Sequence, residues 1–279
     1  MRRVTPVDLP SVTAFLKKRM IRAMFPLSNL ARYGLDGDHD FAPSMWVSED
    51  ATGITGVLTV GRSGVVMPCL PSLNWDDATA VLSDLEVSGF IGPTDEVRPL
   101  IENAKLSGVP TSLDRDEPQF ELALENLSIP EGSGELVQLD KPDIEEMIRW
   151  RADYSVEALG QDRDVANTQA VESYEAYVAA DTHRVLVLDG VPLSTTGFNA
   201  RIPEMVQIGG VYTPPNLRGN GYARRAVALH LKEAREQGAR RATLFSASEN
   251  AARAYSSIGF QPIGKWSLCL FEEKVSVSG

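Results

Sequence analysis

The 279-residue sequence has few of the residues that build disulfides and metal sites. It has two cysteines, Cys69 and Cys269, and three histidines, His39, His183 and His230. The cysteines form no C-x-x-C pair, and the histidines are scattered without metal-ligand spacing. Neither a disulfide framework nor a zinc site is indicated, and we expect no metal cofactor.

Long apolar runs are also missing. No run approaches the roughly 20 apolar residues of a membrane-spanning helix. Met1-Arg2-Arg3 is followed by no apolar segment, so no signal peptide is predicted. The formal net charge of -11 argues against nucleic acid or an anionic membrane as partner. Because 43% of the residues are hydrophobic, a globular core can form. We expect a soluble cytoplasmic protein that binds neither nucleic acid nor membrane.

A segment rich in Pro, Gly and Ser, residues 128–134, is the best candidate for a linker. It suggests an N-terminal domain over residues 1–130 and a C-terminal domain over residues 131–279. Both halves open in the same way, with a strand (residues 4–7 and 136–139), an Asp cap (Asp8 and Asp140), a Pro in the first turn and an amphipathic helix.

The likeness continues along each half. A strand–turn–strand follows, and alternating strand-like segments close each half. The segments are 45–47, 54–60 and 120–127 in the first half, and 184–188, 193–199 and 266–271 in the second. We interpret this as a diverged tandem duplication; the alternative is that such openings are common and the likeness is coincidental.

The C-terminal half contains an ordered run of elements. Residues 205–213 predict a strand interrupted by Gly209-Gly210 and stopped by Pro214-Pro215. A loop leads to a long helix over residues 222–237, which Gly238 ends. A short strand (242–245), a second helix (250–258) and another strand (260–263) follow.

The loop before the long helix has the features of an anion site. A glycine-rich turn at a helix N-terminus offers free backbone N–H groups and the positive end of the helix dipole. Residues 216–241 carry seven Lys and Arg but only two Glu, in an otherwise acidic chain. The pattern favours a phosphate-bearing ligand; for the charges alone, a solvated basic helix face is the simpler explanation.

Two common phosphate-binding motifs do not fit this loop. A P-loop needs Gly-Lys-Ser/Thr, whereas Gly221 is followed by Tyr222-Ala223. A dinucleotide fingerprint needs a third small residue where this chain has Arg224.

The run Arg218-Gly219-Asn220-Gly221-Tyr222-Ala223 instead resembles R/Q-x-x-G-x-G/A, the acetyl-CoA signature of the GNAT family of N-acetyltransferases. The likeness covers residues 206–270 in order and includes Asn250, Tyr255 and Phe260 of the second CoA-contacting segment. It implies the α+β acyl-CoA N-acyltransferase fold with a mixed sheet, here as two tandem GNAT-like domains.

The resemblance also implies a set of cofactor-binding residues. The pantetheine arm would lie along the strand before the loop, the pyrophosphate would rest on the loop, and Asn250 would contact the cofactor arm. The implied residues are Val211, Tyr212, Thr213, Arg218, Gly219, Asn220, Gly221, Tyr222, Ala223 and Asn250. Arg224 is a further candidate for added charge. Gly209-Gly210 permit a bulge at which a ligand can enter, and the alternative is a simple packing pair. The alternative for Asn250 is that it only starts a helix.

Tyr255 matches the family's general acid, which protonates the leaving thiolate; its alternative role is core packing. A backbone N–H near Val211 would stabilise the oxyanion. No base is assigned. Gln207 cannot act as one, and Glu204, Asp153, Glu157 and a water-relayed proton stay open. His183, at a strand start, is expected to be a surface residue.

The N-terminal half departs from the family pattern. Where we expect the matching loop, at residues 87–96, there is no R-x-x-G-x-A, and Pro93, Asp95 and Glu96 would disfavour phosphates. This half is predicted to have lost CoA and to shape the acceptor cleft or mediate homodimerisation. The alternative is an unrelated α+β cap.

The implied activity is N-acetyl transfer from acetyl-CoA to a primary amine of an unidentified acceptor by direct attack in a ternary complex. The acceptor could be a small molecule, an amino acid, a peptide or a protein. Two alternatives stay open: a CoA-binding or sensing module without turnover, and a protein-interaction domain with a vestigial loop. The sequence does not identify the acceptor.

Overall fold

A computed structural model describes residues 1–72, 75–246 and 248–277. The chain divides into two compact units, one of residues Met1–Gln119 with Ile263–Gly279 and one of residues Phe120–Pro262. Among the described helices, none combines the length and the apolar character needed to cross a bilayer.

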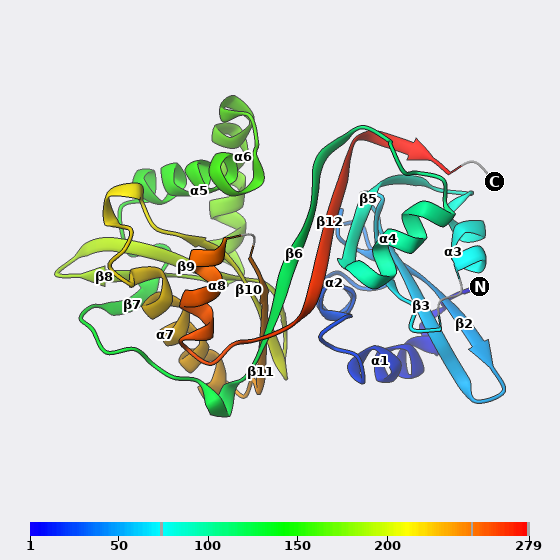
Figure 1. The fold of residues 1–279 in the computed structure, drawn as a ribbon, viewed down its shortest axis with the longest axis horizontal. Helices are drawn as coiled ribbons and strands as arrows, with labels where there is room; N and C mark the ends of the chain where they lie inside the picture. Colours follow the sequence, from blue (N-terminus) through cyan, green and yellow to red (C-terminus); the bar gives the residue numbers. More distant parts are fainter. Residues whose placement is uncertain (73–74, 247, 278–279) are drawn as a thin grey trace. The chain divides into compact units, whose positions relative to one another are not determined.

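The first half of the chain supplies most of the N-terminal unit (Figure 1). Its elements are β1 (Arg2–Arg3), the 3₁₀ turn η1 (Pro6–Asp8), α1 (Leu9–Lys17), α2 (Met24–Tyr33), β2 (Pro43–Asp50), β3 (Gly53–Gly61), β4 (Val65–Cys69), α3 (Trp75–Leu82), β5 (Glu86–Pro93), α4 (Thr94–Asn103), β6 (Thr111–Ala123) and η2 (Leu124–Asn126).

The second half supplies most of the C-terminal unit. Its elements are β7 (Glu135–Gln138), α5 (Ile144–Leu159), α6 (Arg163–Ala179), β8 (His183–Leu188), β9 (Val191–Ile202), β10 (Met205–Tyr212), η3 (Pro215–Leu217), α7 (Tyr222–Glu236), β11 (Arg241–Phe245), α8 (Glu249–Ser256) and β12 (Gln261–Ser276). With the 3₁₀ turns set aside, both halves follow one order, β-α-α-β-β-β-α-β-α-β. This shared order supports the predicted duplication and confirms the mixed α+β architecture.

The repeats exchange their last strands. In the N-terminal unit the strand order is β1-β2-β3-β4-β5-β12-β6, and in the C-terminal unit it is β6-β11-β10-β9-β8-β7. Strand β12, which ends the second repeat, pairs with β5 of the first, and the end of β6 lies beside β11. The compact units therefore interleave the two halves. The boundary at residue 130 stays a prediction about the sequence repeats.

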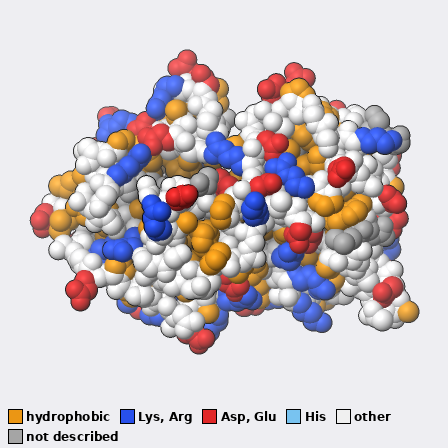
Figure 2. Space-filling model, viewed as in Figure 1, with side chains coloured by type: hydrophobic (Ala, Val, Ile, Leu, Met, Phe, Trp, Pro, Cys, Tyr) orange, Lys and Arg blue, Asp and Glu red, His pale blue; other side chains and the backbone are white. Residues whose placement is uncertain are grey.

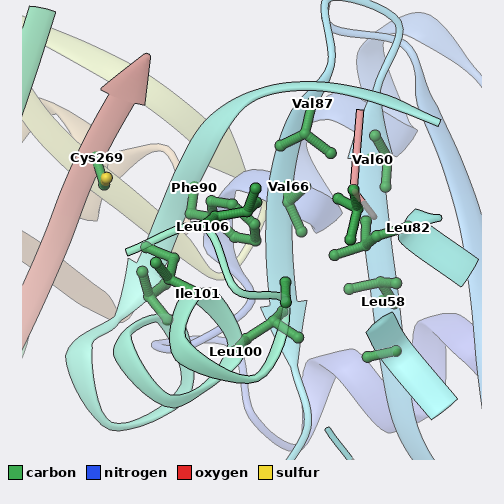
Figure 3. Packing of buried hydrophobic residues seen from close by; sticks show 14 of the residues in the cluster. Leu58, Val60, Val66, Leu82, Val87, Phe90, Leu100, Ile101, Leu106 and Cys269 are labelled. Atoms are coloured by element: carbon green, nitrogen blue, oxygen red, sulfur yellow. The ribbon is translucent and has the colours of Figure 1, made fainter. Parts of the chain in front are cut away.

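The core of the N-terminal unit lies between its sheet and helices α3 and α4. Side chains from β3, β4 and β5, including Leu58, Val66 and Phe90, meet Leu82 of α3 and Leu100 of α4, and all five are fully buried (Figure 3). Cys69 and Cys269 are free, buried thiols in this unit.

The sheet of the C-terminal unit is covered on both faces. Because side chains alternate along a strand, Val185 and Val187 of β8 face one way and Leu186 the other. Val185 and Val187 pack with Trp150 of α5, while Leu186 packs with Ala226 of α7. Helices α5 and α7 therefore lie on opposite faces of this sheet.

Both helix openings differ from the prediction. The first strand is Arg2–Arg3 rather than residues 4–7, because Pro6 begins a 3₁₀ turn whose Asp8 carboxylate accepts hydrogen bonds from the N–H and the hydroxyl of Thr5. In the second half, Asp143 and not Asp140 caps the helix, since its carboxylate accepts the N–H of Glu146 at 2.8 Å.

Candidate active site

Strands β10 and β11 run parallel and are paired only from Met205 to Gln207 on the β10 side. Further along, the pairing of β10 with β9 shifts register between Gly209 and Tyr212. Gly210 has φ +60°, and a Cβ added there would lie 2.7 Å from the Nε2 atom of His183. The bulge predicted at the glycine pair is therefore confirmed, and glycine is required at position 210.

The loop after β10 folds through its own polar groups. The Nε atom of Arg218 donates to the carbonyl of Thr213 at 2.8 Å, and the Asn220 amide donates to the carbonyl of Leu217 at 3.1 Å. Gly219 and Gly221 have φ values of +84° and +77°. The 15-residue helix α7 begins directly after Gly221. Its first N–H groups have no acceptor within the helix, so they point toward the loop as an anion site.

A cavity of about 910 Å³ lies over this loop and extends to α5 and α8. Every residue predicted to bind the cofactor lines it, together with Tyr255; the sequence reasoning missed the additional lining residues Tyr154, Ala158, Leu217, Ser248, Ala251 and Ala254. The volume suits a large ligand. A Cβ added at Gly219 would meet no atom within 4 Å, so the loop is open on this side. These features fit a CoA-sized, phosphate-bearing molecule.

Tyr255 lies on α8 with only 8% of its surface exposed. Its ring meets Phe260 edge-on, with 6.1 Å between centroids, and it also lines the cavity. Burial, with a smaller contribution from Tyr154, raises the pKa of the Tyr255 phenol well above its usual value. The side chain is therefore protonated at neutral pH and packed in place, which is compatible with both roles considered for it.

The candidates for a base separate clearly. Glu157 lines the cavity and pairs with Arg218 at 2.5 Å, whereas Asp153 pairs with Arg163 at 2.6 Å and does not line the cavity. Gln207 is buried and donates to the carbonyl of Ile208, and Glu204 does not line the cavity.

The prediction that His183 is a surface residue is wrong. Only 4% of it is exposed, because its ring stacks on Tyr177 at 3.7 Å and lies beside two glycines, Gly197 and Gly210, that leave room for it. Its Nδ1 atom lies 3.0 Å from the hydroxyl of Thr182. Burial, then the charges of Arg151 and Arg184, lower the pKa of His183 to about 3.

His183 lines a second, narrow cavity of about 20 Å³. Aromatic and apolar side chains form most of its wall: Leu139, Met147, Trp150, Tyr154, Tyr174, Tyr177 and Tyr212. Tyr154 and Tyr212 also line the large cavity, so the two adjoin. Helical spacing of Trp150, Arg151 and Tyr154 on α5 is a signal that could have indicated this wall from the sequence.

Most of the basic residues counted around α7 have partners within the protein. Arg225 donates to carbonyls of the linker, Lys232 pairs with Glu236, Arg235 donates to the carbonyl of Leu124, and Arg241 pairs with Glu121. Basic and acidic side chains are interspersed over the face that Figure 2 shows. Of this set, Arg218 and Arg224 line the large cavity. Arg218 is itself paired with Glu157 at 2.5 Å, so the argument from local charge rests mainly on Arg224.

The N-terminal counterpart of the loop was misplaced. Residues 87–96 form β5 and the start of α4; by element order, the counterpart lies between β4 and α3, at residues 70–74, of which 73–74 are outside the described residues. Glu96 is buried, accepts the N–H of Leu70 at 2.6 Å and pairs with Arg22 at 2.7 Å. Its carboxylate is therefore bonded within the unit, next to the end of β4.

Comparison with known proteins gives the family of the second repeat. The family described as Acetyltransferase (GNAT) matches residues 144–260. No curated protein matches the sequence.

Solved structures share the fold over nearly the whole chain at low identity. A Drosophila protein has a TM-score of 0.66 at 12% identity, covering 99% of each chain. A GCN5-related N-acetyltransferase from Sphaerobacter thermophilus has a TM-score of 0.54 at 14% identity, and the match covers 99% of this chain and 98% of that protein. A tandem GNAT protein from the clavulanic acid biosynthesis pathway has a TM-score of 0.51 at 14% identity, and the match covers 96% of this chain and 97% of that protein. Residues 144–260 therefore match the acetyltransferase (GNAT) family, and the chain shares the fold of a tandem GNAT protein.

Proposed function

We propose that the C-terminal unit is an N-acetyltransferase that uses acetyl-CoA as cosubstrate and a primary amine as acceptor. The observation that carries the proposal is that all residues matching the acetyl-CoA signature line one cavity at the bulged strand β10 and the start of α7. Acetyl transfer is the activity for which the family is named.

The loop and strand would hold the cosubstrate. The N–H groups at the start of α7, with Arg224 beside Gly221, suit the pyrophosphate, because these groups and the helix dipole are positive. The bulge at Gly209-Gly210 leaves backbone of β10 near Val211 and Thr213 facing the cavity, where an extended arm can pair with it.

Bound acetyl-CoA supplies a thioester carbonyl that the acceptor nitrogen attacks, so that a C–N bond forms, the C–S bond breaks and CoA thiolate leaves. Tyr255 is placed to donate its phenolic proton to the leaving sulfur. A backbone N–H near Val211 would stabilise the oxyanion. Water in the cavity would take the proton that the nitrogen releases.

The test is calorimetric titration of acetyl-CoA into the wild type and into Gly221→Glu. The glutamate would place a negative side chain in the loop, so we expect saturable binding only to the wild type. Gly238→Glu is the matched control, because Gly238 also has a positive φ but follows the far end of α7. It should bind like the wild type.

Thiol release with a panel of amines then measures turnover. Binding without turnover would favour the sensing module. No binding to the wild type would contradict the proposal.

A further inference from the structure

We propose that the acceptor is an amine that also carries a carboxylate, of the amino-acid class, and that Arg151 binds this carboxylate in the narrow cavity beside the cofactor cleft. The inference rests on the proposed function and names its substrate class.

Arg151 on α5 is the first observation. Its Nε and Nη1 atoms are buried, and within the described residues neither has a hydrogen-bond partner. The guanidinium carbon lies 5.3 Å from the ring centroid of Tyr154 and 5.6 Å from that of Tyr177. Aromatic faces stabilise the cation but offer no acceptors for its N–H groups. Arg151 as a whole is half-buried, but these two buried donors remain open. Such a guanidinium edge is a site for a planar anion, and a carboxylate fits two of its N–H groups at once.

The charge around Arg151 supports the same conclusion. No Asp or Glu is among the described residues that line the narrow cavity. On α5, Asp153 pairs with Arg163 at 2.6 Å, Glu157 with Arg218 at 2.5 Å and Glu146 with Arg149 at 3.3 Å. Asp140 and Asp153 act on Tyr174 and Tyr212 of the cavity wall from further away, but among the described residues no carboxylate is paired with Arg151. This arrangement favours an acceptor that brings a negative group and disfavours a purely cationic amine.

His183 places a second open polar atom in the same cavity. Its Nε2 atom is buried and has no partner in the described part of the chain, and it faces Gly210 at the bulge of β10. Since Nδ1 is in contact with the hydroxyl of Thr182, Nε2 can accept a hydrogen bond when Nδ1 carries the proton. In this cavity, Arg151 can therefore donate hydrogen bonds to a carboxylate, and the Nε2 atom of His183 can accept one next to the bulge.

The size of the cavity selects the anion. About 20 Å³ holds little more than one water molecule. A carboxylate is smaller and flatter than a tetrahedral phosphate, so it requires less movement of the aromatic rings to enter. The rest of the acceptor would then lie in the large cavity, reached past Tyr154 and Tyr212, where the cosubstrate is expected.

The first experiment compares acids with their amides in the wild type. Initial rates of thiol release are measured with acetyl-CoA and matched pairs such as leucine and leucinamide, or phenylalanine and phenylalaninamide. We expect kcat/KM for the acid to exceed that for the amide by ~10-fold or more, as the loss of a buried charged partner implies. Equal rates, or faster rates with amides, would overturn the inference.

The second experiment compares Arg151→Met with Arg149→Met. Arg149 is exposed on the same helix and pairs with Glu146 at 3.3 Å. We expect Arg151→Met to raise KM for acids by ~10-fold or more, with KM for amides unchanged, and Arg149→Met to change neither. Thermal unfolding checks that Arg151→Met folds; if it does not, the comparison of acids and amides in the wild type still decides.

Calorimetric binding of the amino acids separates the two proposals. If acetyl-CoA binds but acids have no advantage over amides in rate or affinity, the inference fails alone. If acetyl-CoA does not bind, the transferase proposal fails. The Arg151 carboxylate site is still supported if the wild type binds acids saturably but not amides, and if Arg151→Met abolishes that binding. If acids do not bind, with or without acetyl-CoA, the inference about Arg151 is overturned.

Discussion

The guanidinium of Arg218 lies 2.5 Å from the carboxylate of Glu157, so an ion pair joins the loop before α7 to helix α5. Glu157 also accepts a hydrogen bond from the phenol of Tyr212 at 3.4 Å. Both members of the pair line the large cavity and are partly exposed. The first residue of the acetyl-CoA signature is thus neutralised by a side chain of another element, and a carboxylate stands beside the proposed pyrophosphate site.

We expect Glu157→Gln to bind acetyl-CoA more tightly and Arg218→Gln to bind it more weakly. Removal of the carboxylate frees Arg218 and removes a repulsion, whereas removal of Arg218 leaves Glu157 unopposed. Because both groups are partly solvent-screened, each change should be roughly twofold to fivefold in Kd. Calorimetry measures it, with Glu145→Gln, an exposed position on α5, as control. Weaker binding by Glu157→Gln would show that the pair helps to build the site.

Tyr255→Phe should lower kcat by ~100-fold or more while the Kd of acetyl-CoA stays unchanged. The phenylalanine keeps the ring against Phe260 but removes the buried hydroxyl, so packing is retained and the proton donor is lost. Single-turnover thiol release and calorimetry measure the two quantities, with Tyr33→Phe in the N-terminal unit as control. An unchanged kcat would favour the packing role of Tyr255.

The run from β10 to α8 could be predicted from sequence because each signal in it is local. Pro214-Pro215 ends the strand, glycines mark the loop, and the apolar spacing of α7 repeats along one continuous segment. The predicted helix of residues 222–237 differs from α7 by a single residue at its end. A ligand-binding loop whose conformation depends on residues adjacent in sequence can therefore be predicted, and so can the residues that surround it.

The strand exchange between the repeats could not be predicted in this way. Pairing of β12 with β5 joins residues such as Trp266 and Pro93, which are far apart in the chain. Alternating apolar residues predict that a strand forms, but they do not predict which other strand it pairs with. The same limit affected His183, whose burial depends on Gly197 and Gly210 from other strands. Partners of charged residues are equally non-local, so a count of charges around α7 overestimated the free positive charge.

Arg225→Met should destabilise the C-terminal unit by about 1–3 kcal/mol. Arg225 donates to three carbonyls of the linker, those of Pro130 at 2.7 Å, Ser133 at 3.0 Å and Gly134 at 3.4 Å, and methionine can replace none of these bonds. Urea unfolding measures the change in free energy, and limited proteolysis within residues 128–134 should become faster.

The control for Arg225 is Lys232→Met on the same helix. Lys232 is partly exposed and pairs with Glu236 one turn away, so its loss should cost no more than about 0.5 kcal/mol and leave the linker protected. Equal unfolding free energies for the two variants would mean that the linker is held by other contacts.

His183 should make the stability of the protein depend on pH below neutrality. Burial, then Arg151 and Arg184, lower its pKa from 6.5 to about 3 in the folded state. Between these values the unfolded chain binds the proton and the folded chain does not, so the free energy of unfolding falls as the pH falls from 6.5 toward 3. Buried His230, whose pKa is also lowered, acts in the same direction and is retained in a His183 variant.

Between pH 7 and pH 5 the His183 contribution should be roughly 2 kcal/mol. Urea unfolding of the wild type and of His183→Gln at pH 7, 6 and 5 measures it. The variant should start less stable at pH 7, because glutamine does not replace the ring stacked on Tyr177, but should lose less stability on acidification. If the free energies of unfolding of the two proteins change with pH in parallel, His183 must be protonated in the folded state as easily as in the unfolded state. The narrow cavity would then be open to water.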